Sequence, residues 1–123
     1  MTTILVVEDE YAVAELLRDS LTEEGYTVLV CADGRAALET LAAQHVDLIL
    51  SDVMMPRMDG RALVQALRAN PRYQATPIIL MSAGHGNVDP ARDGFDAYIS
   101  KPFNLYKLLA TVAELLARGA PPG

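Results

Sequence analysis

The chain has 123 residues, 51% of them hydrophobic, and its 16 acidic side chains outnumber 10 basic ones, which gives a formal net charge of −6. This length and composition predict one domain with its own core and exclude a disordered chain, while the single cysteine excludes a disulfide framework and a cysteine-rich zinc site. The acidic balance argues against direct nucleic-acid binding, no apolar run reaches the roughly 20 residues of a membrane span, and the start of the chain lacks the features of a signal peptide, so we expect a cytoplasmic protein.

The first half of the chain alternates short apolar runs with helical periodicity. A largely β-branched run at 4–7 predicts a strand that is buried on both faces. Apolar residues then recur at helical spacing over 13–21, which predicts an amphipathic helix. A second strand is expected at 28–30, and Asp33 is the expected N-cap of the helix that follows it.

The second half repeats this pattern. Strands are expected at 48–50, 77–81 and 97–99, with a helix around 63–67 between the first two of them. The last helix, over 105–116, has the clearest apolar stripe in the chain. Strands that alternate with helices predict an α/β fold, in which a doubly wound parallel sheet has helices on both faces.

One segment interrupts the alternation. Residues 83–94 lie where a fourth helix should follow the fourth strand, but they contain three glycines and a proline and almost no apolar stripe. Glycine and proline both disfavour the interior of a helix. We therefore predict a short or irregular fourth helix, of a turn or two at most.

Polar residues follow four of the five predicted strands. Glu8 and Asp9 follow the first strand, Asp52 the third, Ser82 the fourth and Lys101 the fifth. Ligands of doubly wound sheets bind beyond the carboxyl ends of the strands, so these side chains are expected to converge. Three carboxylates at neighbouring strand ends repel one another unless a cation lies among them, and oxygen ligands of this kind suit Mg²⁺.

The same residues suit phosphoryl transfer. An aspartate can act as a nucleophile towards phosphorus, and the reaction requires charge neutralisation on the phosphoryl oxygens more than acid–base groups. Magnesium would neutralise one side of the phosphoryl group and the Lys101 ammonium another, while the Ser82 hydroxyl could donate to a third oxygen. Each component of such a site is therefore present.

Four stretches of the sequence resemble the receiver domain of two-component response regulators, and the resemblance covers essentially the whole chain. The stretches are 6–10, 52–60, 77–83 and 98–103. The Asp-x-x-Met-Pro-x-Met-Asp-Gly and Lys-Pro-Phe sequences among them are the most specific. The family implies a flavodoxin-like fold with strand order 2-1-3-4-5. It also implies phosphorylation by a partner histidine kinase or histidine phosphotransfer protein, followed by Mg²⁺-dependent self-dephosphorylation, with no other enzymatic activity.

The resemblance also assigns residues to the phosphorylation and metal sites. Asp52 matches the phosphoacceptor. Asp9 matches the carboxylate that binds Mg²⁺ directly, and Glu8 matches the one that usually acts through water. The backbone carbonyl of Met54 matches the third protein ligand, so the implied metal site consists of Glu8, Asp9, Asp52 and Met54.

Three further positions match the family's switch and phosphate contacts. Ser82 corresponds to the hydroxyl that moves towards the phosphoryl group, and Tyr98 to the aromatic switch that follows it. Lys101 corresponds to the lysine that contacts the phosphate. The bond between Lys101 and Pro102 is cis in the family, although only about 5–6% of bonds before proline are cis in folded proteins.

The family resemblance also bears on organisation and output. It implies a receiver domain over 1–118. The Gly-Ala-Pro-Pro-Gly sequence that follows cannot continue the last helix and predicts a flexible tail over 119–123. The interval from Ser82 to Lys101 is a few residues short, and the missing length falls on the fourth helix, which belongs to the family's usual output and dimerisation face. We therefore expect a monomer that does not use that symmetric face and that signals by contact with a downstream protein target.

Other functions fit the sequence less well. A flavin-binding domain would need a phosphate-binding loop where Glu8 and its acidic neighbours stand, and a phosphatase with its nucleophile after the first strand would need Asp-x-Asp there. A phosphorylation-independent, receiver-like interaction module should have lost at least one site residue. Two contexts stay open: a stand-alone regulator, which the position of Met1 directly before the first strand favours, and a receiver excised from a hybrid kinase or a longer regulator.

Overall fold

The computed structural model describes residues 2–55, 58–83 and 89–119, which form an α/β fold around one parallel sheet. The strands are β1 (Thr3–Val7), β2 (Thr27–Cys31), β3 (Leu48–Asp52), β4 (Ile78–Ser82) and β5 (Ala97–Ser100). The helices are α1 (Tyr11–Glu23), α2 (Gly34–Ala43), α3 (Gly60–Arg68), α4 (Pro90–Asp93) and α5 (Leu105–Gly119). The strand order β2-β1-β3-β4-β5 and the parallel pairing confirm the predicted doubly wound sheet.

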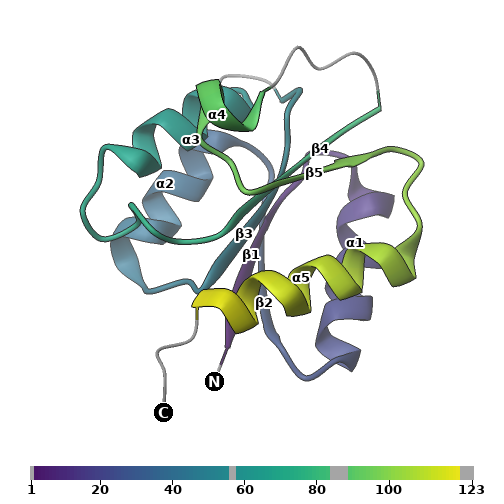
Figure 1. Cartoon of the computed structure of the whole chain (residues 1–123). Coiled ribbons are helices and arrows are strands. Elements are labelled where there is room, and N and C mark those ends of the chain that lie inside the picture. The colour runs from purple at the N-terminus through teal and green to yellow at the C-terminus, as the bar shows by residue number, and fades with distance from the viewer. Residues whose placement is uncertain (1, 56–57, 84–88, 120–123) are drawn as a thin grey trace.

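Helices cover both faces of the sheet, with α1 and α5 on one face and α2, α3 and α4 on the other (Figure 1). Successive strand residues point to opposite faces, so each strand contributes to two cores. In β1, Leu5 and Val7 pack into the core beneath α2 and α3, whereas Ile4 and Val6 pack into the core beneath α1 and α5. All five residues of β3 and all five residues of β4 are buried. This burial explains the continuous apolar runs that the sequence shows at these two strands.

Side chains cap α2 and α5, and the cap at Asp33 is one that the sequence predicted. The Asp33 carboxylate accepts a hydrogen bond from the Ala36 amide at 2.9 Å, which begins α2. Asn104 accepts one from the Lys107 amide at 3.1 Å, which begins α5. Each bond satisfies an amide that has no partner within the helix.

Helix α4 has only four residues, in agreement with the predicted short fourth helix. Asp89 caps it by accepting from the Arg92 amide, and Gly94 ends it with a left-handed φ of +84°. Residues 84–88 of the same predicted segment lie outside the described residues, as do residues 120–123 of the predicted tail. Helix α5 itself continues to Gly119.

A single arginine joins the end of α3 to the segments around it. Arg68 is the last residue of α3, and its guanidinium donates to the carboxylate of Asp96 at 2.9 Å, directly before β5. It also donates to four main-chain carbonyls, those of Tyr73, Gln74, Thr76 and Gly94, at 2.8 to 3.1 Å. The sequence did not predict this network.

Among the residues that the structure describes, no helix combines the length and the apolar composition needed to cross a membrane.

Candidate functional site

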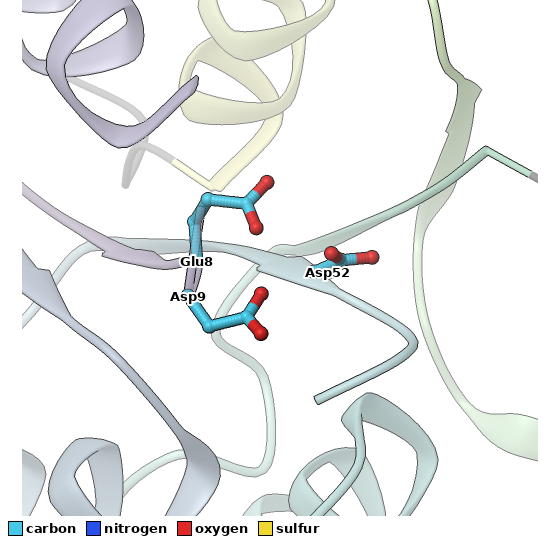
Figure 2. A group of neighbouring side chains, drawn as sticks. All are labelled: Glu8, Asp9 and Asp52. Atoms are coloured by element: carbon cyan, nitrogen blue, oxygen red, sulfur yellow. The ribbon is translucent and has the colours of Figure 1, made fainter. Parts of the chain in front are cut away.

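Three carboxylates meet at the carboxyl edge of the sheet. Glu8 and Asp9 follow β1, and Asp52 is the last residue of β3, which pairs with β1 in parallel register. One carboxylate oxygen from each of the three residues lies within 4.8 Å of the other two. Figure 2 shows Glu8 and Asp9 extending from the end of β1 towards Asp52. The neighbouring, parallel strands therefore bring Asp52 next to two acids that lie far from it in the sequence.

Two of these carboxylates are withdrawn from solvent. Glu8 has 2% of its surface exposed and Asp52 has 7%, whereas Asp9 is exposed. Burial disfavours the charged form of a carboxylate, and a second carboxylate nearby disfavours it further. The arrangement thus requires a positive charge among the acids.

Lys101 supplies a positive charge at the end of β5. Its Nζ lies 2.5 Å from Oε1 of Glu8 and 3.1 Å from Oδ2 of Asp52. Both distances are those of hydrogen-bonded ion pairs, and the lysine side chain is largely buried. One ammonium faces three carboxylates, so the site keeps an excess of negative charge when all four groups are ionised.

The pKa values of Glu8 and Lys101 reflect this crowding. Burial raises the pKa of the Glu8 carboxyl above its ordinary value, the hydrogen bond from Lys101 opposes that rise, and the charge of Asp52 adds to it. Burial alone would lower the pKa of Lys101, but its hydrogen bonds to Glu8 and Asp52 outweigh burial and raise the pKa. The site therefore favours a proton on Lys101 and disfavours charge on Glu8.

We predict that Glu8→Gln raises the stability of the metal-free protein near pH 7. Because the folded-state pKa of Glu8 is raised, its stabilising contribution is complete below the ordinary value of 4.5 and is lost as the pH rises through the folded-state pKa. A neutral glutamine avoids that loss. Urea unfolding with a chelator should give a higher midpoint for the variant at neutral pH and a smaller difference at acidic pH. A lower midpoint at neutral pH would contradict the prediction.

The loop after β3 closes directly beside Asp52. The Met54 amide lies 3.4 Å from Oδ1 of Asp52, a long hydrogen bond, and the Gly60 amide donates to the Val53 carbonyl at 2.8 Å. A Cβ atom on Gly60 would lie only 2.6 Å from the main-chain oxygen of Asp52, so a side chain at this position would push the strand end away. The main chain of Met54 is thereby held next to the carboxylate cluster.

Ser82 and Tyr98 belong to β4 and β5, the two strands that follow β3 in the sheet. Ser82 is the buried last residue of β4, and its main-chain carbonyl accepts from the Lys101 amide at 2.9 Å. The Tyr98 hydroxyl lies 3.5 Å from the same carbonyl, and its half-buried ring packs against the core beneath α2 and α3. The bond between Lys101 and Pro102 is cis, as the family resemblance implied.

The structure therefore brings together all the residues that the sequence assigned to the site. The sequence predicted that Lys101 would contact a phosphoryl group but not that it would bridge two carboxylates. The sequence did contain a signal for these ion pairs, because the strand end that carries Lys101 was expected at the same edge of the sheet as the three acids.

Comparison with known proteins identifies the class of this domain. The fold and the acidic strand ends are those of a signalling module with a flavodoxin-like sheet, and the family model described as "Response regulator receiver domain" matches residues 4–113. The chain therefore belongs to the response regulator receiver family. Domains of this family serve in two-component signalling rather than as enzymes that act on external substrates.

The relatives agree with this assignment. The response regulator MprA of Mycolicibacterium vanbaalenii is 42% identical over an alignment of 122 residues, and the match covers 96% of this chain and 52% of the relative. The chain spans about half the length of that relative. A receiver domain of a signal transduction histidine kinase from Syntrophus aciditrophicus superposes with a TM-score of 0.90 at 35% identity and covers 100% of this chain and 96% of that one.

A second similar structure was solved with a metal. It is the receiver domain of a sensor histidine kinase from Pseudomonas aeruginosa PAO1, described with a magnesium ion coordinated in the active site cleft. Its TM-score is 0.87 at 28% identity, and the match covers 94% of this chain and 98% of that one.

Proposed function

We propose that this receiver accepts a phosphoryl group on Asp52 from a histidine kinase or a histidine phosphotransfer protein, in a reaction that depends on Mg²⁺. The observation that carries the proposal is the cluster of Glu8, Asp9 and Asp52, with Lys101 hydrogen-bonded to two of its members. A nucleophile, metal ligands and a cation are thus present within one small volume.

The donor set fits Mg²⁺. Three carboxylates within 4.8 Å of one another offer hard oxygen ligands, which magnesium prefers to nitrogen or sulfur. Asp9, Asp52 and the main-chain oxygen of Met54 would hold the ion directly, and Glu8 would act through water. When bound, Mg²⁺ supplies positive charge to the phosphoryl oxygens. The magnesium ion described for the related Pseudomonas receiver supports this choice.

The chain's own residues would perform the transfer as follows. An Asp52 carboxylate oxygen attacks phosphorus, and the new O–P bond forms while the P–N bond to the donor histidine breaks. The imidazole that leaves takes up a proton and is released neutral. Lys101 Nζ, 3.1 Å from Oδ2 of Asp52, is within reach of an oxygen of the transferred group and opposes its charge.

The proposal includes the loss of the phosphoryl group and the switch. Attack of water on phosphorus would return the Asp52 carboxylate and inorganic phosphate, so the chain would catalyse only its own phosphorylation and dephosphorylation. Ser82 would donate its hydroxyl to a phosphoryl oxygen, and Tyr98 would follow. In support, Tyr98 and Lys101 both approach the Ser82 carbonyl, so a shift of Ser82 acts on both.

Output is proposed to occur through contact of a monomer with a downstream protein, without direct binding of nucleic acid. A cytoplasmic location is proposed as well. A phosphorylation-independent interaction module is the competing function. The presence of Glu8, Asp9, Asp52 and Lys101 in one group favours phosphorylation.

Intact-mass spectrometry with an acyl phosphate and Mg²⁺ tests the proposal. The wild type is expected to gain the mass of one phosphoryl group, and Asp52→Asn is expected to gain none. Asp19→Asn, at an exposed acid of α1, is the matched control and should behave as the wild type. A chelator should prevent the mass gain. An unmodified wild type, or a modified Asp52→Asn variant, would refute the proposed function.

A further inference from the structure

The junction between β2 and α2, residues 31–34, lies against the candidate site. The Cys31 carbonyl accepts from the Glu8 amide at 2.9 Å, so the end of β2 fixes the main chain of one of the site's acids. Asp33, which caps α2, is buried, and Gly34 is the buried first residue of that helix. The junction is therefore a well-packed segment whose position is set by the sheet and by the helix cap.

Gly34 also touches the other half of the site. A Cβ atom on Gly34 would lie 2.8 Å from Cγ, 2.9 Å from Cβ and 2.9 Å from the main-chain oxygen of Met58, which belongs to the loop after Asp52. Protein Cβ atoms essentially never approach other atoms so closely, and one of these contacts is with backbone. Glycine is a poor helix former, so its use at this helix start is explained by the close approach.

We propose that Gly34 is a positioning residue for the metal site: its lack of a side chain lets the β2–α2 junction close against Met58 and so leaves the neighbouring Gly60 in place against the main chain of Asp52. This inference rests on the proposed function, because it concerns the same metal and phosphoryl site. It adds a residue that lies outside the motifs of the family resemblance and on a different segment from every site residue.

Met58 lies only two residues before Gly60. Gly60 is held by its hydrogen bond to Val53 and by its close approach to the main-chain oxygen of Asp52. A side chain at position 34 would therefore press on Met58 close to a fixed point of the main chain. The displacement should pass through Gly60 to the main chain of Asp52, whose carboxylate is a proposed ligand.

Magnesium binding by Gly34→Ala is the first test. Mg²⁺ titrations followed by amide NMR shifts should give a midpoint about tenfold higher than for the wild type, since changes to residues that support metal ligands typically cost 10-fold to 100-fold in affinity. Gly25→Ala is the matched control. Gly25 has a φ of +97° and no atom within 4 Å of an added Cβ, so the variant should unfold at a lower temperature but bind Mg²⁺ as the wild type does.

A double-mutant cycle with Met58→Gly isolates the contact. Met58→Gly removes two of the three atoms that a Cβ at position 34 would meet, and the backbone freedom of glycine lets the third, the main-chain oxygen, move away. The double variant should therefore bind Mg²⁺ more tightly than Gly34→Ala alone. The double variant also serves if Gly34→Ala fails to fold, because relief of the contact should then restore folding.

The outcomes separate this inference from the proposed function. A wild-type midpoint in folded Gly34→Ala, additive effects in the cycle, or a double variant that also fails to fold would overturn the role of Gly34. In each of those cases the wild type would still bind Mg²⁺ and gain the phosphoryl mass. Failure of the wild type to do either would instead refute the proposed function itself.

Discussion

Replacement of Lys101 by methionine is expected to destabilise the metal-free protein by about 3 kcal/mol, because loss of one partner from a buried ion pair leaves the other charge uncompensated. Glu8 and Asp52 are both buried, and the lysine Nζ lies within 3.1 Å of an oxygen of each. Methionine keeps much of the side-chain volume and removes only the charge and the donors. Urea unfolding in the presence of a chelator measures the difference.

Mg²⁺ should reduce that deficit. The ammonium and the metal would share the carboxylates of Glu8 and Asp52, so removal of the ammonium leaves more negative charge for the ion to neutralise. We therefore expect Mg²⁺ to stabilise Lys101→Met more than it stabilises the wild type. Phosphorylation by an acyl phosphate should nevertheless fall sharply, because Lys101 is the side chain proposed to oppose the phosphoryl charge.

Lys107→Met is the control for these measurements. Lys107 is the other lysine of the chain and is exposed on α5, so its loss should change stability by no more than about 0.5 kcal/mol. If Lys101→Met without metal is as stable as the wild type, the ion pairs of Lys101 contribute nothing to the apo state, and the prediction is wrong.

The site could be predicted from the sequence because each of its charged residues stands at the end of a strand. Glu8 and Asp52 follow apolar runs that are continuous enough to identify buried parallel strands, and parallel strands place their carboxyl ends at one edge. The order of the strands in the sheet then determines which strand ends lie next to each other. The strand order itself came from the family resemblance, because alternating periodicity does not specify it.

Contacts between irregular segments could not be predicted in this way. Gly34 touches Met58, and Arg68 reaches the carbonyl of Gly94, through side-chain positions that no periodicity encodes. An arginine at the end of an amphipathic helix is ordinarily a solvent-exposed cation that complements the helix dipole. The acceptors around Arg68 become apparent only when the turn after α3 and the segment before β5 are placed in space.

Replacement of Arg68 by methionine is expected to cost about 3 kcal/mol of folding free energy, since each buried polar group that loses its partner costs about 1–3 kcal/mol. The guanidinium is partly exposed, and water should satisfy some of the carbonyls it leaves. The carboxylate of Asp96 keeps one partner, because its Oδ2 also accepts from the Ile78 amide at 2.8 Å. The cost should therefore be well below the sum over all the lost bonds.

Two variants decide whether geometry or charge accounts for the loss. Arg68→Lys keeps the charge for Asp96 but lacks the planar set of donors, so it should recover less than half of the stability. Arg72→Met removes the exposed arginine whose guanidinium lies 5.6 Å from the ring centre of Tyr73, and it should cost less than about 1 kcal/mol. Urea unfolding of the three variants gives these values.

Hydrogen exchange would locate the effect of Arg68→Met within the fold. The Asp96 amide donates to the Ile78 carbonyl at 2.8 Å and so begins the pairing of β5 with β4, at the end opposite to Lys101. Loss of the guanidinium should therefore speed exchange at Asp96 before it affects the carboxyl edge. Because β5 carries Tyr98 and leads into Lys101, a strand that opens from its start would loosen the proposed switch without any change in the site's own residues. Unchanged exchange at Asp96 in a destabilised variant would show instead that Arg68 acts on the turn after α3 alone.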